Sequence, residues 1–357
     1  MRLHGTAKSL KKRFPFIDII LGTSNLHLLS EKIAAVGQKR GLVDVAEYGG
    51  VAELSSYRTS GANAWVNIIY GCNNFCTYCI VPYVRGRERS RKESDIIAEV
   101  EELLSQGYKE ITLLGQNVNS YGKDFSDGGS FAVLLQKLAN LPYKYRLRFL
   151  TSHPKDLSDE VIDAVAQNKN ICKSIHLPVQ SGSTEILRRM NRRYTRDDYL
   201  SLVGRIREKI SGVGLSSDIM VGFPGETEED FQDTLDVVRK ARFASCYCFV
   251  YSRRKGTPGY SMENQIPREI KTDRIKRLIA EQNKITREIS KTFEGKTIEI
   301  LVDGLNDKYV GVYCGRTDCG KLVNFKSERD LTGGFATVKI NRSQSATLFG
   351  EIIDYQL

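Results

Sequence analysis

Residues 64–79 read AWVNIIYGCNNFCTYC, an apolar run that leads directly into a loop containing Cys72, Cys76 and Cys79. The apolar run predicts a buried β-strand that ends near Tyr70. The C-x3-C-x2-C spacing is short enough for one loop to wrap a cube of iron and sulfur. Three thiolates can hold three irons of a [4Fe-4S] cluster and leave the fourth iron open to an external ligand. We therefore expect these three cysteines to be the metal ligands and the catalytic residues.

Two other interpretations of the three cysteines remain open. A structural zinc site would need a fourth protein ligand, and the nearest histidine, His153, lies far along the chain. Plain buried thiols are disfavoured because the neighbouring side chains of Asn73, Asn74 and Thr77 are polar. The other five cysteines occur singly or in pairs without a third neighbour, so we interpret them as buried or incidental thiols.

Downstream of residue 58, apolar runs alternate about six times with amphipathic charged stretches. This alternation is typical of βα units and a parallel sheet. The expected strands are 64–70, 110–114, 146–150, 174–177, 215–221 and 245–251. The expected helices are 94–106, 131–141, 158–167, 196–210 and 227–242, followed by a long charged helix at 267–292. We therefore predict an α/β fold with a partial (β/α)6 barrel over residues 58–292, whose functional groups lie on the loops after the strands.

The two ends of the chain have a different texture. Residues 293–357 contain short apolar runs separated by Gly and Asp turns, which predicts an all-β domain similar to an OB fold. Its expected strands are 296–302, 309–313, 322–325, 336–340 and 347–352. Residues 1–57 predict a helix at 4–13, a strand at 17–20 and a helix at 28–35, which are too few elements to enclose a core of their own.

The 357-residue chain carries 53 Lys and Arg residues against 43 Asp and Glu residues, a net charge of +10. This surplus favours a polyanionic partner, although it also fits an ordinary basic protein. Basic residues cluster at 85–92, 188–196 and 253–255, which would form a phosphate-binding surface if folding brings them to one face and three solvated loops if it does not. No stretch approaches the roughly 18 consecutive apolar residues of a membrane span, and no signal peptide is recognisable. We expect a cytoplasmic protein without a membrane partner.

Several motifs give the chain a more specific likeness. The cysteine loop resembles that of the radical S-adenosylmethionine superfamily, and residues 80–90, IVPYVRGRERS, are similar to the methylthiotransferases within it. Four further segments resemble the tRNA-2-methylthio-N6-dimethylallyladenosine synthase branch: LGQNVNSY at 114–121, TSHP at 151–154, HLPVQSGS at 176–183 and VGFPGE at 221–226. The sister branch, which modifies an aspartate of a ribosomal protein, typically has Gln-His where this chain has Gln180 and Ser181. Residues 293–357 resemble the TRAM domain, which binds RNA in that family.

This resemblance implies a radical enzyme that acts on tRNA. Such an enzyme adds a methylthio group to C2 of N6-isopentenyladenosine, next to the anticodon, by way of a 5′-deoxyadenosyl radical. The implied cofactors are the [4Fe-4S] cluster and S-adenosylmethionine. The implied partners are the anticodon stem-loop of tRNA and an electron donor such as flavodoxin or ferredoxin, and the chain is expected to be a monomer. The alternatives are a ribosomal-protein aspartate methylthiotransferase and a non-catalytic, metal-stabilised RNA-binding protein.

Position after the strands indicates which residues would contact S-adenosylmethionine, with a purely structural hydrogen bond as the alternative for each. The expected cofactor-binding residues are Gln116, Ser152, Gln180, Asp218, Gly222 and Tyr78. Alternation along 85–89 would point three arginines the same way if that segment is extended. The expected RNA-binding residues are Arg85, Arg87, Arg89, Arg253 and Lys321.

Proteins of this family also have an N-terminal domain whose three cysteines bind a second [4Fe-4S] cluster that takes part in sulfur delivery. No cysteine precedes Cys72 in this sequence. We therefore interpret residues 1–57 as a truncated remnant of that α/β domain. On this interpretation, cleavage of S-adenosylmethionine is expected, whereas sulfur insertion depends on ligands that the sequence does not contain.

Overall fold

The computed structural model describes residues 2–36, 41–45 and 61–356. Its first elements are the helices α1 (Arg2–Arg13) and α2 (Leu29–Val36) and the parallel strands β1 (Ile19–Leu21) and β2 (Leu42–Asp44). The three expected elements are present within about two residues of their expected bounds. The strand β2 was not expected, because three residues are too few to show an alternating pattern. The expected domain boundary at residue 57 lies outside the described residues.

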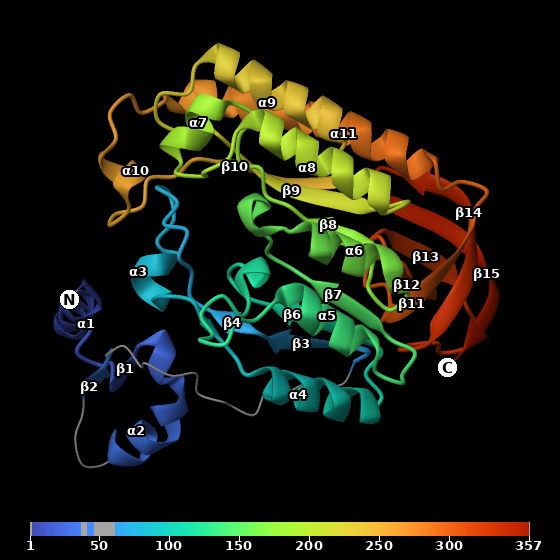
Figure 1. Ribbon diagram of the computed structural model, residues 1–357, viewed down its shortest axis with the longest axis horizontal. Coiled ribbons are helices and arrows are strands. Elements are labelled where there is room, and N and C mark those ends of the chain that lie inside the picture. Colours follow the sequence, from blue (N-terminus) through green and yellow to red (C-terminus); the bar gives the residue numbers. More distant parts are fainter. Residues whose placement is uncertain (1, 37–40, 46–60, 357) are drawn as a thin grey trace.

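Six parallel strands form the middle of the molecule (Figure 1). One sheet contains β3 (Asn63–Asn67), β6 (Glu110–Leu114) and β7 (Arg146–Phe149), and the next contains β8 (Ser174–His176), β9 (Gly214–Val221) and β10 (Ser245–Val250). A parallel bridge between Leu147 and Ile171 connects β7 to the segment that precedes β8. In the described part of the chain β3 and β10 are edge strands that do not pair with each other. The predicted partial barrel is therefore confirmed, and it is open along one side.

Amphipathic helices cover the outer face of these strands and enclose the main hydrophobic core (Figure 1). They are α4 (Glu93–Ser105), α5 (Phe131–Ala139), α6 (Asp159–Gln167), α7 (Thr184–Arg189), α8 (Arg196–Lys209), α9 (Glu228–Ala241) and α11 (Arg268–Lys291). Thr195 and Thr227 begin α8 and α9 with capping boxes, in which the hydroxyl accepts a bond from an amide three residues on and an aspartate there accepts one from the threonine amide. The short helix α7 was not expected.

Edge strands of the barrel expose aromatic side chains on their inner face. In β3, Ala64 and Val66 pack against the helices, whereas Trp65 between them is 68% exposed. In β10, Tyr247 and Phe249 are likewise exposed, and they flank the half-buried Cys248. Alternate strand residues point to opposite faces, so these aromatic rings lie on the side of the sheet that faces away from the helices.

A closed five-stranded barrel forms the C-terminal part, in the order β11-β12-β13-β15-β14. The strands are β11 (Thr297–Leu305), β12 (Val312–Thr317), β13 (Leu322–Lys326), β14 (Phe335–Gln344) and β15 (Thr347–Gln356). This confirms the predicted OB-like fold, although β12 begins three residues later than expected. A Cβ on Gly214, at the start of β9, would lie 2.1 Å from the carbonyl oxygen of Cys319, so the two barrels are in direct contact. Figure 1 shows the small barrel at the opposite end of the strands from the cysteine loop and α3 (Val81–Arg85).

Candidate active site

The cysteine loop leaves β4 (Ile69–Tyr70) and returns through α3 to β5 (Arg89–Ser90), which pairs with β4. Gly71 has φ +75°, and a Cβ there would lie 2.0 Å from the carbonyl oxygen of Arg87, so only glycine allows this close return. Cys76 is buried, and Cys72 and Cys79 are half-buried. The amide of Asn74 lies 3.6 Å from Cys72 Sγ. One compact loop therefore presents all three thiols.

Without bound metal, the surroundings of this loop favour neutral thiols over thiolates. Burial raises the pKa of Cys72 to about 11 and also raises the pKa of Cys79, and the nearby Cys76 adds to both shifts. Thiolates in such a place need a positive partner, and bound iron supplies one. Among the described residues, no three His, Cys, Asp or Glu side chains converge on a single ion position. The three thiols thus lie close enough to influence one another and are not gathered around one ion.

A second segment, residues 189–194, is hydrogen-bonded to the cysteine loop. The amide of Thr77 donates to the carbonyl of Met190 at 3.1 Å. Asn191, in a left-handed conformation at φ +59°, donates its side-chain amide to the carbonyls of Asn74 and Phe75 at 3.2 and 3.1 Å. Arg192 points a guanidinium nitrogen at Cys76 Sγ, 3.5 Å away. The sequence reasoning missed this contact, because it assigned Arg192 to an exposed basic cluster.

The loops after β6 and β7 carry buried polar groups that have no hydrogen-bond partner among the described residues. These atoms are both amide atoms of Asn119, Oδ1 of Asn117, Oγ of Ser152 and Nε2 of His153. All four side chains are at most 5% exposed. An unsatisfied buried polar atom costs about 1–3 kcal/mol, so this part of the rim is suited to a polar ligand that supplies the missing bonds. S-adenosylmethionine, with its ribose, adenine and amino-acid groups, fits that requirement.

The predicted cofactor-binding residues occupy different positions on the rim. Ser152 belongs to the unsatisfied group, and Gln116 is half-buried on the neighbouring loop. Gln180 is buried at φ +71°, and its backbone bonds to β9 at Asp218 and Met220. Asp218 is half-buried, with Oδ1 3.5 Å from Nε2 of His176. Their contacts with a cofactor remain predictions.

For two further predicted residues, Gly222 and Tyr78, contacts within the protein explain part of why these residue types occur there. Gly222 has φ +73°, and a Cβ there would meet the side chain of Lys271 at 2.3 Å. Its amide donates to Glu226, a buried carboxylate that pairs with Arg274 at 2.8 Å, and burial raises the pKa of Glu226 to about 7. Tyr78 packs against an apolar cluster of Ile186, Met190, Phe223 and Tyr251. Both remain predictions as cofactor contacts.

The expected basic surface is only partly formed. Arg85 ends helix α3 and Gly86 follows at φ +77°, so residues 85–89 are not one extended segment as we had supposed. Arg85, Arg87 and Arg253 are exposed, and Arg89 is half-buried, so these four remain candidates for RNA contact. Lys321 was wrongly predicted to bind RNA. It is 6% exposed, and its ammonium group bonds Ser290 Oγ at 3.1 Å inside the junction of the two barrels.

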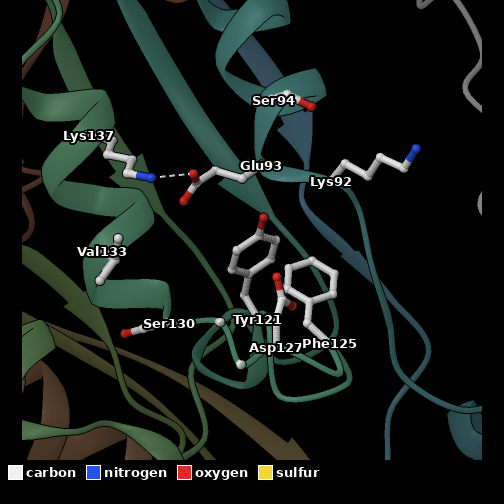
Figure 2. A pocket seen from close by; sticks show the side chains of 11 residues that line it. Lys92, Glu93, Ser94, Tyr121, Phe125, Asp127, Ser130, Val133 and Lys137 are labelled. Carbon is white, nitrogen blue, oxygen red and sulfur yellow. Dashed lines mark hydrogen bonds and ion pairs between the residues drawn. The ribbon is translucent and has the colours of Figure 1, made fainter.

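A separate pocket of about 700 Å³ lies between the starts of α4 and α5 and the loop 121–130 (Figure 2). Glu93 and Lys137 form an ion pair across it, and Tyr121 and Phe125 line its inner side. None of the predicted site residues lines this pocket. The candidate active site is therefore the rim around the cysteine loop.

Comparison with known proteins assigns a family to this arrangement. Residues 66–238 match the family described as the radical SAM superfamily, and residues 291–353 match the TRAM domain. A tRNA-2-methylthio-N(6)-dimethylallyladenosine synthase of Acetivibrio thermocellus is 50% identical over 96% of this chain and 72% of its own length. The synthases of Caldicellulosiruptor saccharolyticus and Clostridium perfringens are each 51% identical, over 97% and 99% of this chain and 74% and 80% of their own lengths. The chain belongs to the tRNA-2-methylthio-N(6)-dimethylallyladenosine synthase family.

The solved structures are similar to this chain only at low sequence identity and low TM-score. A radical S-adenosylmethionine methyltransferase, TsrM, from Kitasatospora setae is 20% identical, with a TM-score of 0.47 over 56% of this chain and 36% of its own. Coproporphyrinogen III oxidase from Escherichia coli is 15% identical, with a TM-score of 0.46 over 78% and 66% of the two chains. Membership of the synthase family therefore rests on the sequence relatives. No helix in the described part of the chain is long and apolar enough to span a membrane.

Proposed function

We propose that this chain is a tRNA methylthiotransferase that modifies C2 of N6-isopentenyladenosine next to the anticodon. The observation that carries the proposal is the placement of three thiols on one loop, in a chain about half identical to curated synthases over nearly its whole length. When bound, the cluster and S-adenosylmethionine supply one-electron reductive cleavage of the sulfonium. The remaining tasks fall to the side chains of this chain.

The side chains around the loop are suited to holding and shielding the reacting groups. Cys72, Cys76 and Cys79 would bind three irons, and Tyr78 with its apolar neighbours would keep water from the cluster. Ser152, Asn119 and His153 would satisfy their unpaired polar atoms on S-adenosylmethionine and so orient it. The exposed Arg85, Arg87 and Arg253 would contact phosphates of the anticodon stem-loop.

Four finer parts of the proposal go beyond the family assignment. We propose that sulfur insertion requires a second [4Fe-4S] cluster in addition to the one at Cys72, Cys76 and Cys79. We also propose a flavodoxin or ferredoxin as the electron donor, a monomeric chain and a cytoplasmic location. Size-exclusion chromatography tests the oligomeric state. Reduction of the cluster by purified flavodoxin tests the electron donor.

The direct test is anaerobic reconstitution of the full chain with iron and sulfide. We expect a [4Fe-4S] EPR signal after dithionite reduction and release of 5′-deoxyadenosine from S-adenosylmethionine. The variant Cys76→Ala should lose both, whereas Cys314→Ala, in the C-terminal barrel, should keep both. Mass spectrometry of an isopentenylated anticodon stem-loop then reports methylthiolation. An intact cluster that never cleaves S-adenosylmethionine would contradict the proposal.

A further inference from the structure

Arg192 is a buried cation in contact with a cysteine of the site. It lies between α7 and α8 and is 4% exposed. Its Nε donates to the Tyr194 hydroxyl at 2.8 Å, and its Nη2 donates to the carbonyl of Pro178 at 2.8 Å. Its Nη1 lies 3.5 Å from Cys76 Sγ. Every guanidinium nitrogen is therefore engaged, and one of them faces the sulfur.

The charge of Arg192 has no carboxylate partner among the described residues. The ionisable groups that act on it with negative sign are the hydroxyls of Tyr194 and Tyr78 and the thiol of Cys76. At neutral pH ordinary tyrosines are uncharged, so of these three groups the sulfur is the one that metal binding would make an anion. The other buried arginines of the described residues are paired: Arg274 with Glu226, Arg91 with Glu99 and Arg146 with Glu299. An unpaired buried cation is costly, so its presence beside Cys76 indicates that a negative group belongs there.

We propose that Arg192 is the buried counter-charge of the iron–sulfur cluster and acts through the sulfur of Cys76. The inference rests on the proposed function, because it takes the cluster to be held by Cys72, Cys76 and Cys79. A [4Fe-4S] cluster with three thiolates is an anion, and one-electron reduction makes it more negative. A fixed cation and an N–H donor at one sulfur therefore stabilise the reduced form more than the oxidised form. Arg192 is a positioning residue that raises the reduction potential of the cluster.

The geometry also explains why an arginine fills this place. Its planar fork presents a separate nitrogen to each of Pro178, Tyr194 and Cys76, whereas an ammonium group would have to reach all three from one nitrogen. The same charge contributes, after burial, to holding the pKa of His153 at about 2. The field of Arg192 thus reaches both the cysteine loop and the polar rim.

The test compares the reconstituted full chain with three variants by EPR-monitored redox titration, before any S-adenosylmethionine is added. Arg192→Met keeps an unbranched side chain and removes the charge. Arg192→Lys keeps the charge and loses the fork. Arg188→Met is the matched control, because Arg188 lies in the last turn of α7, shortly before Arg192, and is exposed beside Glu185. Circular dichroism and iron content check folding and cluster loading.

For Arg192→Met we expect the ratio of reduced to oxidised cluster, measured at the wild-type midpoint potential, to fall at least tenfold. This corresponds to a midpoint potential lower by about 59 mV for one electron. Arg192→Lys should retain most of the wild-type potential, and Arg188→Met should match the wild type. Loss of iron from a folded Arg192→Met chain, with Arg192→Lys still loaded, also supports the counter-charge. Equal potentials in Arg192→Met and the wild type overturn it, as does an equal loss in Arg192→Lys. If the wild type itself binds no cluster, the proposed function fails first.

Discussion

At the scale of single residues, His153 shows how burial sets a protonation state. It is 5% exposed, and its Nδ1 accepts a bond from the amide of Lys155 at 3.3 Å. Burial, followed by the charge of Arg192, lowers its pKa to about 2. The imidazole is therefore neutral in the folded protein, with its proton on the nitrogen that faces the polar rim.

This state makes the stability of the protein depend on pH in a defined direction. Below pH 6.5 the unfolded chain takes up a proton on His153 that the folded chain does not, so stability falls as pH falls. The expected loss from this residue is about 1 kcal/mol between pH 6.5 and 5.5. Urea unfolding at both pH values should show a smaller loss for His153→Asn than for the wild type. Parallel pH profiles of the two proteins would rule out this role.

At the scale of elements, the turn after α7 acts as a clamp on the cysteine loop. Asn191→Ala would remove two hydrogen bonds and place a Cβ-bearing residue without a local partner in a left-handed conformation. We expect a loss of stability on the order of 2–3 kcal/mol and faster hydrogen exchange in residues 74–79. Asn191→Gly tolerates the conformation and should lose less stability. Unchanged exchange in the cysteine loop of Asn191→Ala would show that the clamp is unimportant.

At the scale of the whole molecule, Arg148 joins the two barrels. It pairs with the buried Glu110 at 2.7 Å and donates to the carbonyls of Thr317 and Asp318 at 2.7 and 2.9 Å. These contacts link the start of the α/β barrel to the turn between β12 and β13. The C-terminal barrel is therefore attached through the Arg148 guanidinium, which pairs with the buried Glu110 of its own barrel and donates to two carbonyls of the other.

Breaking this junction should lower the free energy of unfolding. Arg148→Met leaves Glu110 buried without its partner, and we expect a loss of about 3–5 kcal/mol in the free energy of unfolding. Adding Glu110→Gln should recover part of that loss. Lys144→Met, which breaks an exposed pair with Glu299, should cost less than about 1 kcal/mol. Urea unfolding of the four proteins measures these differences, and equal losses for Arg148→Met and Lys144→Met would contradict the argument.

Local features of this protein were predictable because they depend on neighbours in the chain. The strand 110–114 was predicted with its observed bounds, and the expected helices differ from α4, α6, α8 and α9 by at most one residue at each end. Short elements without a full period, such as β2 and α7, could not be predicted this way. The cysteine loop was also predictable, since its three thiols lie within eight residues.

The sequence by itself determined the α/β and OB-like barrels, the family and the three candidate cluster ligands, because periodicity and motif spacing are short-range properties. Only the tertiary structure decided which basic residues remain at the surface. Arg192 and Lys321 are both hydrophilic in any sequence scale, yet one is buried beside Cys76 and the other between the two barrels. Burial depends on segments that arrive from elsewhere in the chain, 116 residues away in the case of Arg192 and Cys76. No local pattern carries that information.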